Sequence, residues 1–311
     1  KISALPCYSV IPLGGNSPLT HDDKTGYQVP AAFGDYRVMH QLGVGVLGPV
    51  FRGYPPDGDH LVALKAFHLE LLPEQACEFA DALAGVVALG PLHPSMVRPL
   101  GSGIADGVPF LAYEYVAAES LDVAIRGQLP ATVDAVVPLT LQLAEAFDAA
   151  HERGLCHGSL HPRDIFVTSD LMRVGGFGIQ TLLEDVGLRG PLRRPFAAPE
   201  QVAARQWGPA ADRFALAAVT YEVLTGKRAS GADSKLADEF AEIAGGRYSS
   251  ALSQVFVSAL EGDPAMRPGS ARIFAEQLAE AVEWSGAGRV LGPVGFNRST
   301  VDSNSDERSE S

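Results

Sequence analysis

Three glycines and one lysine near the start of the chain have the types and spacing needed to hold a phosphate group. Gly43, Gly45 and Gly48 form a G-x-G-x-x-G pattern, and glycines at this spacing let the backbone approach phosphate oxygens closely. Lys65 ends the run Val-Ala-Leu-Lys, where a lysine on a strand could reach the same phosphates. Together the two features indicate a nucleotide-binding unit.

The residues after the glycines separate two folds that use this pattern. A dinucleotide-binding fold begins a helix directly after the glycines, whereas here Val50 lies in the strand-like run PVFRGY. That run turns through PPDGDH into a second strand-like run, VALKAF. The pattern therefore favours a β-hairpin that covers a nucleotide over a dinucleotide site.

A second group of polar side chains lies in CHGSLHPRDIFV, residues 156–167. The helix-ending pattern HERGL precedes this stretch, Pro162 makes a turn within it, and the strand-like IFV ends it. A loop held between a helix and a strand is a typical place for catalytic residues, because rigid elements position it. Asp164 is the only carboxylate in the stretch, beside His157, Ser159 and His161.

The elements that position these residues fall into two lobes. Between residues 34 and 113, short strand-like runs separated by Gly and Pro-Asp-Gly turns predict about five strands, and residues 73–89 predict one helix. From 117 to 284, apolar residues recur at three- and four-residue spacing, which predicts a mostly helical lobe. The fold class is therefore α+β, with a small β-rich lobe followed by a larger α-helical lobe.

The two ends of the chain differ from this core in composition. Residues 1–33 are rich in Pro, Gly and Asp and show no periodicity, which predicts an extended N-terminal segment. Residues 285–311 are polar, which predicts a disordered tail.

Composition and charge exclude several classes of function. The net charge of -13 repels phosphate backbones and argues against nucleic acid as a partner. Three scattered cysteines are too few for a disulfide framework or a metal cluster and favour a reducing compartment. The longest apolar run is shorter than the roughly 18–20 residues that span a bilayer, so we expect no direct membrane insertion.

Further motifs occur in an order and spacing that resemble the eukaryotic-type Ser/Thr protein kinase family, in particular its bacterial members. The resemblance runs from about Tyr36 to Trp284 and implies a bilobal kinase-like fold over residues 34–284, with lobes at 34–113 and 117–284. After the glycines and Lys65, the matching motifs are HPSMV at 93–97, EYVAAESL at 114–121, the loop from 157, GFG at 176–178, APE at 198–200, AADRFAL at 210–216 and DPAMRP at 263–268.

The same resemblance predicts that the phosphate-transfer chemistry is lost. When the family motif H-R-D-L-K-P-x-N is placed on residues 157–164, Ser159 stands where the catalytic aspartate should be, and a serine cannot accept the substrate proton near neutral pH. His161 replaces the lysine that contacts the transferring phosphate. Gly176 replaces the metal-binding aspartate of D-F-G, which leaves Asp164 as a weak metal candidate.

Nucleotide binding is expected to be weak, independent of Mg²⁺, or absent. The helix that should give Lys65 a glutamate partner carries Ala82 at or near that position, although a shifted helix register could turn Asp81 inward. The resemblance implies an ATP site at the three glycines and Lys65, with an adenine slot and hinge formed by Val50, Ala63, Phe166, Tyr113 and the backbone of Glu114 and Val116.

Residues that support the kinase frame are retained. By resemblance, Glu200 and Arg267 form a buried ion pair, and Asp212 holds the backbone of the loop at 157. A buried charge without its partner costs about 3–5 kcal/mol. The presence of both members of the pair therefore indicates that the architecture of the kinase fold is retained.

Two hypotheses follow from these residues. The first is a pseudokinase, that is, a kinase fold that serves as a binding, allosteric or scaffold module for a protein partner of unknown identity. The second is a weak or unconventional Ser/Thr kinase that uses ATP, with Glu184 or Asp185 replacing the missing metal ligand. By analogy with bacterial members of the family, we expect a cytoplasmic protein or the cytoplasmic domain of a longer membrane protein.

Overall fold

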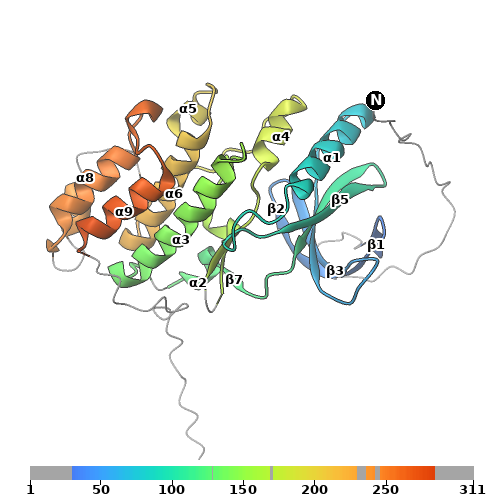
Figure 1. Ribbon diagram of the computed structural model, residues 1–311, viewed down its shortest axis with the longest axis horizontal. Helices are drawn as coiled ribbons and strands as arrows, with labels where there is room; N and C mark the ends of the chain where they lie inside the picture. The colour runs from blue at the N-terminus through green and yellow to red at the C-terminus, as the bar shows by residue number, and fades with distance from the viewer. Residues whose placement is uncertain (1–29, 128, 169–170, 230–235, 242–245, 284–311) are drawn as a thin grey trace, which may run out of the picture.

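An antiparallel sheet covered by one helix forms the first lobe, and a group of helices forms the second (Figure 1). The computed structural model describes residues 30–127, 129–168, 171–229, 236–241 and 246–283. The N-terminal segment up to residue 29 and the tail predicted from residue 285 lie outside the described residues. The predicted α+β, two-lobed architecture is confirmed.

The first lobe contains six strands in the order β1-β2-β3-β4-β6-β5, all paired antiparallel. One of them, β1, lies in the segment assigned above to the N-terminal extension and pairs with the start of β2. The predicted helix is present as α1 (Pro73–Ala88). The strands are β1 (Ala32–Phe33), β2 (Tyr36–Gly45), β3 (Gly48–Tyr54), β4 (Val62–Ala66), β5 (Pro99–Ala105) and β6 (Val108–Glu114).

Alternating burial explains why these runs form a sheet. In β4, Val62, Leu64 and Ala66 are buried while the residues between them are only partly buried, which is the two-residue period of a strand. On the buried face the rings of Phe33 and Phe51 lie 5.3 Å apart. This face makes the core of the first lobe.

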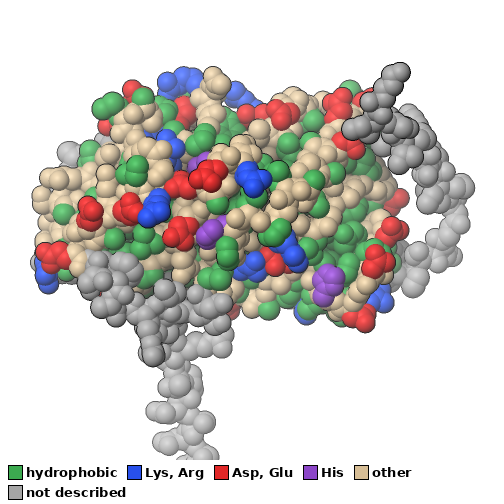
Figure 2. Space-filling view, viewed as in Figure 1, with side chains coloured by type: hydrophobic (Ala, Val, Ile, Leu, Met, Phe, Trp, Pro, Cys, Tyr) green, Lys and Arg blue, Asp and Glu red, His purple; other side chains and the backbone are tan. Residues whose placement is uncertain are grey.

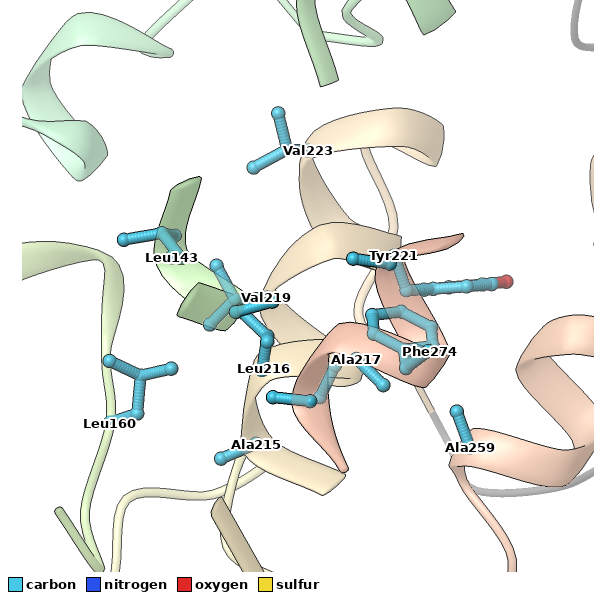
Figure 3. Close-up of a cluster of buried hydrophobic side chains, with 14 of the residues drawn as sticks. Leu143, Leu160, Ala215, Leu216, Ala217, Val219, Tyr221, Val223, Ala259 and Phe274 are labelled. Atoms are coloured by element: carbon cyan, nitrogen blue, oxygen red, sulfur yellow. The ribbon is translucent and has the colours of Figure 1, made fainter. Parts of the chain in front are cut away.

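The second lobe is built around α6 (Pro209–Thr225), which is buried along most of its length. The other helices and short strands surround it, and Figure 3 shows the apolar side chains that pack around Leu216, Val219 and Tyr221. The remaining elements are β7 (Glu119–Ser120), α2 (Leu121–Ala124), α3 (Val133–His151), η1 (Pro162–Asp164), β8 (Ile165–Val167), β9 (Met172–Val174), α4 (Ile179–Asp185), α5 (Pro199–Val202), α7 (Leu236–Ala241), α8 (Ser249–Ala259), η3 (Pro264–Met266) and α9 (Ala271–Ala281).

The surface drawn in Figure 2 carries acidic and basic side chains that are interspersed over both lobes. Within the described residues, no helix is both long enough and apolar enough to span a membrane.

A short helix that the sequence analysis did not predict connects the two lobes. Helix α4 follows the GFG motif directly and lies beside α1 (Figure 1). Ile179 and Leu183 of α4 pack in one apolar cluster with Phe79 and Leu83 of α1. The Gln75 side chain of α1 also donates a hydrogen bond to the carbonyl oxygen at the end of α4, at 2.9 Å. Helix α4 therefore packs against α1 through apolar side chains and one hydrogen bond.

Candidate functional site

One buried carboxylate holds the backbone of the loop that begins at His157. Asp212, at the start of α6, accepts hydrogen bonds from the backbone N–H groups of His157 at 2.8 Å and Gly158 at 2.7 Å. Its third contact is with the His151 ring, whose Nε2 lies 2.9 Å away. Because the carboxylate is fully buried, these contacts fix the backbone of the loop.

A second buried charge pair ties the end of the APE motif to the second lobe. Both Nη atoms of Arg267 lie 2.7 Å from the two carboxylate oxygens of Glu200. The two side chains are 0% and 2% exposed, and Arg267 also donates to the carbonyl oxygens of Ala210 and Glu261. The pair therefore links α5 to the start of α6 and to the chain before η3.

His157 connects the loop to the GFG motif. Its Nδ1 accepts a hydrogen bond from the Ser159 N–H at 3.3 Å, so its Nε2 carries the hydrogen that is donated to the Gly175 carbonyl oxygen at 2.8 Å. Phe177 packs edge-on against the His157 ring. Gly176 has a φ of +96°, a conformation that favours glycine, and it offers only backbone atoms where the family has a metal-binding aspartate.

His161 is a weak source of positive charge. Its ring stands edge-on to Phe196, and its Nδ1 accepts a hydrogen bond from the Arg163 N–H. Burial lowers the pKa of His161, and the positive charges of Arg193 and Arg163 lower it further, while Asp164 acts in the opposite sense. The imidazole is therefore mostly neutral near pH 7.

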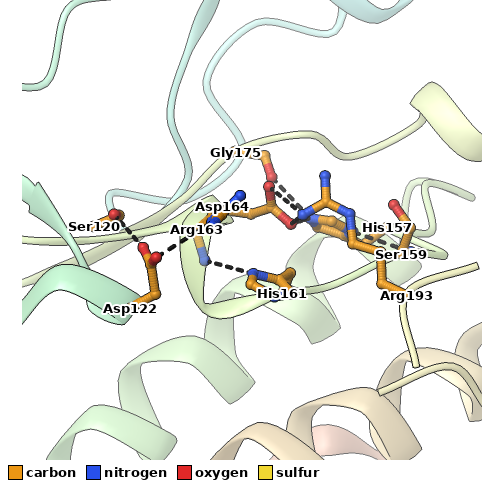
Figure 4. A network of polar contacts seen from close by, with 9 residues as sticks. All are labelled: Ser120, Asp122, His157, Ser159, His161, Arg163, Asp164, Gly175 and Arg193. Carbon is orange, nitrogen blue, oxygen red and sulfur yellow. Dashed lines mark hydrogen bonds and ion pairs between the residues drawn. The ribbon is translucent and has the colours of Figure 1, made fainter. Parts of the chain in front are cut away.

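Asp164 is paired with an arginine from a distant part of the sequence. The Nη1 atom of Arg193 lies 3.2 Å and 3.4 Å from the two oxygens of Asp164 (Figure 4). Arg193 lies shortly before the APE motif. By resemblance, either Arg193 or Arg194 takes the place of the threonine usual in the family, and Arg194 is exposed. The carboxylate predicted as a metal candidate is therefore in contact with a guanidinium.

Lys65 contacts a carbonyl oxygen instead of a carboxylate. Its Nζ donates a hydrogen bond to the Gly48 carbonyl oxygen at 2.6 Å. Glu78 and Asp81 lie on the exposed face of α1, and no carboxylate of the described residues lies within 4.0 Å of Nζ. The alternative register that turns Asp81 inward is wrong, because α1 directs Phe79 and Leu83 into the core.

The surroundings of Lys65 are short of negative charge. Burial lowers the pKa of Lys65 to about 8; the positive charge of Arg193 acts in the same direction, and Asp164 opposes it. Lys65 is therefore mostly charged at pH 7 and loses its charge as the pH rises through about 8.

The glycine-rich turn lies close to β4. At Gly48, with a φ of +131°, a Cβ atom would lie 2.4 Å from the Ala66 carbonyl oxygen, so this position excludes other residues. Gly45 pairs with Gly48 across the turn, and Leu47 packs against the apolar cluster of α1 and α4. A Cβ at Gly43 would meet nothing within 4 Å, so packing alone does not require that glycine.

The expected adenine slot contains the predicted side chains, and the hinge backbone is partly engaged. Val50, Ala63 and Phe166 are partly buried. The Glu114 N–H donates to the Arg98 carbonyl oxygen, and the Val116 carbonyl accepts from the Ala118 N–H. Tyr113 borders a cavity of about 20 Å³ between α1 and Phe177, which is large enough for little more than a water molecule.

The chain is similar to known proteins of one family. The family description "Protein kinase domain" matches residues 36–278, which is most of the chain. The chain belongs to the protein kinase family. The predicted family resemblance is confirmed.

Its bacterial relatives are serine/threonine protein kinases by name. Pkn3 of Myxococcus xanthus is 28% identical over 78% of this chain and 49% of its own length. Pkn2 of the same organism is 31% identical over 80% of this chain and 32% of its own length. This chain thus spans half or less of the length of these two relatives. The crystal structure of the Mycobacterium tuberculosis PknI kinase domain superposes with a TM-score of 0.64 at 27% identity, covering 80% of this chain and 97% of that domain.

The contact between Arg193 and Asp164 was missed from the sequence. The two residues are 29 positions apart, and the sequence shows only that Arg193 or Arg194 replaces the usual threonine before the APE motif. That replacement marks the position as unusual, but only the fold shows that Arg193 contacts Asp164.

Proposed function

We propose that this chain is a pseudokinase, a kinase fold that binds a nucleotide weakly without a metal ion, does not transfer phosphate, and acts as a binding or allosteric module for a protein partner. The observation that carries the proposal is the Arg193 guanidinium on Asp164, in a chain that has glycine rather than a carboxylate at position 176. The position where the family holds a catalytic metal ion has one carboxylate, and that carboxylate is paired with a cation of the protein.

The residues at this position do not fit a magnesium ion. Mg²⁺ requires octahedral oxygen ligands and is usually held by one or two carboxylates together with phosphate oxygens and water. Gly176 supplies no side-chain oxygen, and a metal ion at Asp164 would have to displace Arg193.

The alternative, a weak or unconventional Ser/Thr kinase, is favoured by the retained glycine turn and Lys65. It requires a second carboxylate, for which Glu184 and Asp185 were the candidates. In the structure both belong to α4, and the Glu184 carboxylate accepts hydrogen bonds from the Trp207 ring N–H at 2.8 Å and 3.0 Å. Recruiting Glu184 would break these bonds, which favours the pseudokinase.

The melting temperature tests nucleotide binding directly. ATP at about 100 times its Kd should stabilise the protein by about 2.7 kcal/mol, which is roughly 2–4 °C for a domain of this size. We expect this rise with ATP in EDTA, no further rise with Mg²⁺, and no rise for Lys65→Met. A rise that occurs only with Mg²⁺ would support the kinase alternative.

A further inference from the structure

Lys65, Arg193 and Asp164 interact with one another and together carry more positive than negative charge. Lys65 and Arg193 both carry a positive charge at pH 7, and Asp164 is the only carboxylate of the described residues within 4.0 Å of either side chain's nitrogen atoms. The hinge carboxylate, Glu114, does not balance these charges, because it is paired with Arg173. A half-buried cation without a counter-ion is costly, and this excess is notable in a chain whose net charge is -13.

Arg193 is bound more loosely than the structural arginine of the same lobe. Only Nη1 contacts Asp164, at 3.2 Å and 3.4 Å, whereas Arg267 grips Glu200 with two nitrogens at 2.7 Å. Charge-assisted bonds of this kind are usually about 2.7–2.9 Å long. The Nε of Arg193 is buried and has no hydrogen-bond partner among the described residues. The guanidinium therefore retains donor capacity for a second anion.

Arg193 lies beside both Asp164 and Lys65 in the fold. Asp164 ends η1, directly before β8 with its slot residue Phe166, and its backbone carbonyl accepts a hydrogen bond from the Gly175 N–H at 3.0 Å. Figure 4 shows Arg193 reaching this carboxylate from the opposite side to Arg163. Arg193 thus contacts the end of the loop that begins at His157, and Lys65 is close enough for the two positive charges to interact.

We infer that Arg193 is an internal replacement for a divalent cation: together with Lys65 it forms a polyphosphate site, and its guanidinium bridges Asp164 and a phosphoryl oxygen. The inference rests on the proposed function and deepens it, because it names the residue that makes a metal ion unnecessary. The shared ligand chemistry is a chain of two or three phosphates, whether it belongs to a nucleoside di- or triphosphate or to inorganic polyphosphate. Arginine suits this role because its planar fork matches phosphate geometry and keeps its charge at all physiological pH values.

Direct competition between Arg193 and a metal ion follows from this assignment. In the native protein Mg²⁺ should not strengthen binding, because Asp164 is engaged by Arg193. Once Arg193 is removed, Asp164 becomes available and a metal ion can bridge it to the phosphates. The variant should therefore gain a dependence on Mg²⁺ that the native protein lacks.

Calorimetric titration of the whole chain with ATP, and separately with sodium tripolyphosphate, tests the site in EDTA and in excess Mg²⁺. For the native protein we expect affinities that differ by less than about threefold between the two conditions. Arg193→Gln should weaken binding in EDTA by about 10–100-fold, the usual effect of losing a hydrogen bond to a charged group. In Mg²⁺, Arg193→Gln should recover part of the lost affinity, and the double variant Arg193→Gln with Asp164→Asn should recover none.

The two ligands separate the phosphates from the nucleoside. Binding of tripolyphosphate would show that the phosphates suffice, and binding of ATP alone would show that the nucleoside is also needed.

Two control variants separate this role from folding and from general charge. Arg194→Gln removes the neighbouring exposed arginine and should leave affinity unchanged, while Arg193→Lys keeps the charge without the planar fork and should retain only part of the affinity. The melting temperature without ligand should be the same for all of them within about 2 °C. If the native protein binds and Arg193→Gln binds equally well in EDTA, the assignment of Arg193 is overturned while the proposed nucleotide binding stands. Absence of binding by the native protein would overturn both. Phosphate transfer by the native protein would instead overturn the proposed function, so the two failures are distinguishable.

Discussion

Replacing Arg267 with methionine is expected to lower the free energy of unfolding by about 3–5 kcal/mol, because it leaves the Glu200 carboxylate buried without its partner. The substitution also removes the donors to the carbonyl oxygens of Ala210 and Glu261. Urea unfolding followed by circular dichroism measures the loss. A shift of the same size for Arg272→Met would contradict the account, because the pair of Arg272 and Glu276 is exposed and such pairs contribute little.

A second variant separates the effect of an unpaired charge from the effect of lost packing. Replacing both Glu200 and Arg267 with apolar residues of similar volume should restore much of the stability lost in Arg267→Met, because no buried charge then remains unpaired. If the double variant is less stable than the single one, lost packing rather than the unpaired carboxylate explains the destabilisation.

Asp212→Ala is the other substitution with a large expected effect. The carboxylate is the acceptor for the N–H groups of His157 and Gly158 and lies 2.9 Å from the His151 ring. Each buried donor left unsatisfied costs about 1–3 kcal/mol, so we expect a loss on the order of 3–5 kcal/mol in urea unfolding. Asp212→Asn keeps one acceptor oxygen and should fall between the native protein and Asp212→Ala. Equal stability of the alanine variant and the native protein would mean that the loop does not depend on this carboxylate.

Much of the fold could be predicted because its signals are local or carried by motifs. The alternation in Val62, Leu64 and Ala66 predicts a strand, and the three- and four-residue spacing along α3 predicts a helix. The pairing of Glu200 with Arg267 spans 67 positions and could be expected only from the family resemblance. Periodicity alone would not have found it.

Helix α4 was missed although its sequence contains a usable signal. Ile179, Leu182, Leu183 and Val186 recur at three- and four-residue spacing, which is typical of one face of a helix. The segment is short, and an isolated helix of this length is unstable in water. Packing against α1 stabilises it, and that packing depends on residues about 100 positions earlier in the chain.

The partners of Lys65 and Asp164 were predicted only in part. The absence of a glutamate opposite Lys65 follows from the apolar and exposed positions of α1, whereas its actual partner is a backbone carbonyl, which no side-chain pattern reveals. The guanidinium on Asp164 comes from the segment between α4 and α5, 29 positions along the chain. Sequence patterns therefore identified which groups are missing, and the fold identified which groups replace them.

Transfer of the γ-phosphate under single-turnover conditions tests the central claim most directly. Labelled ATP is incubated with a molar excess of the protein in Mg²⁺ or Mn²⁺, with a mixed Ser/Thr protein acceptor, and product is compared with that of Lys65→Met. Loss of a positioned base alone lowers a rate by about 10²–10⁴-fold, and the metal ligand is missing as well. The account predicts no labelled product above the level of Lys65→Met, and labelled product that depends on Lys65 would contradict it.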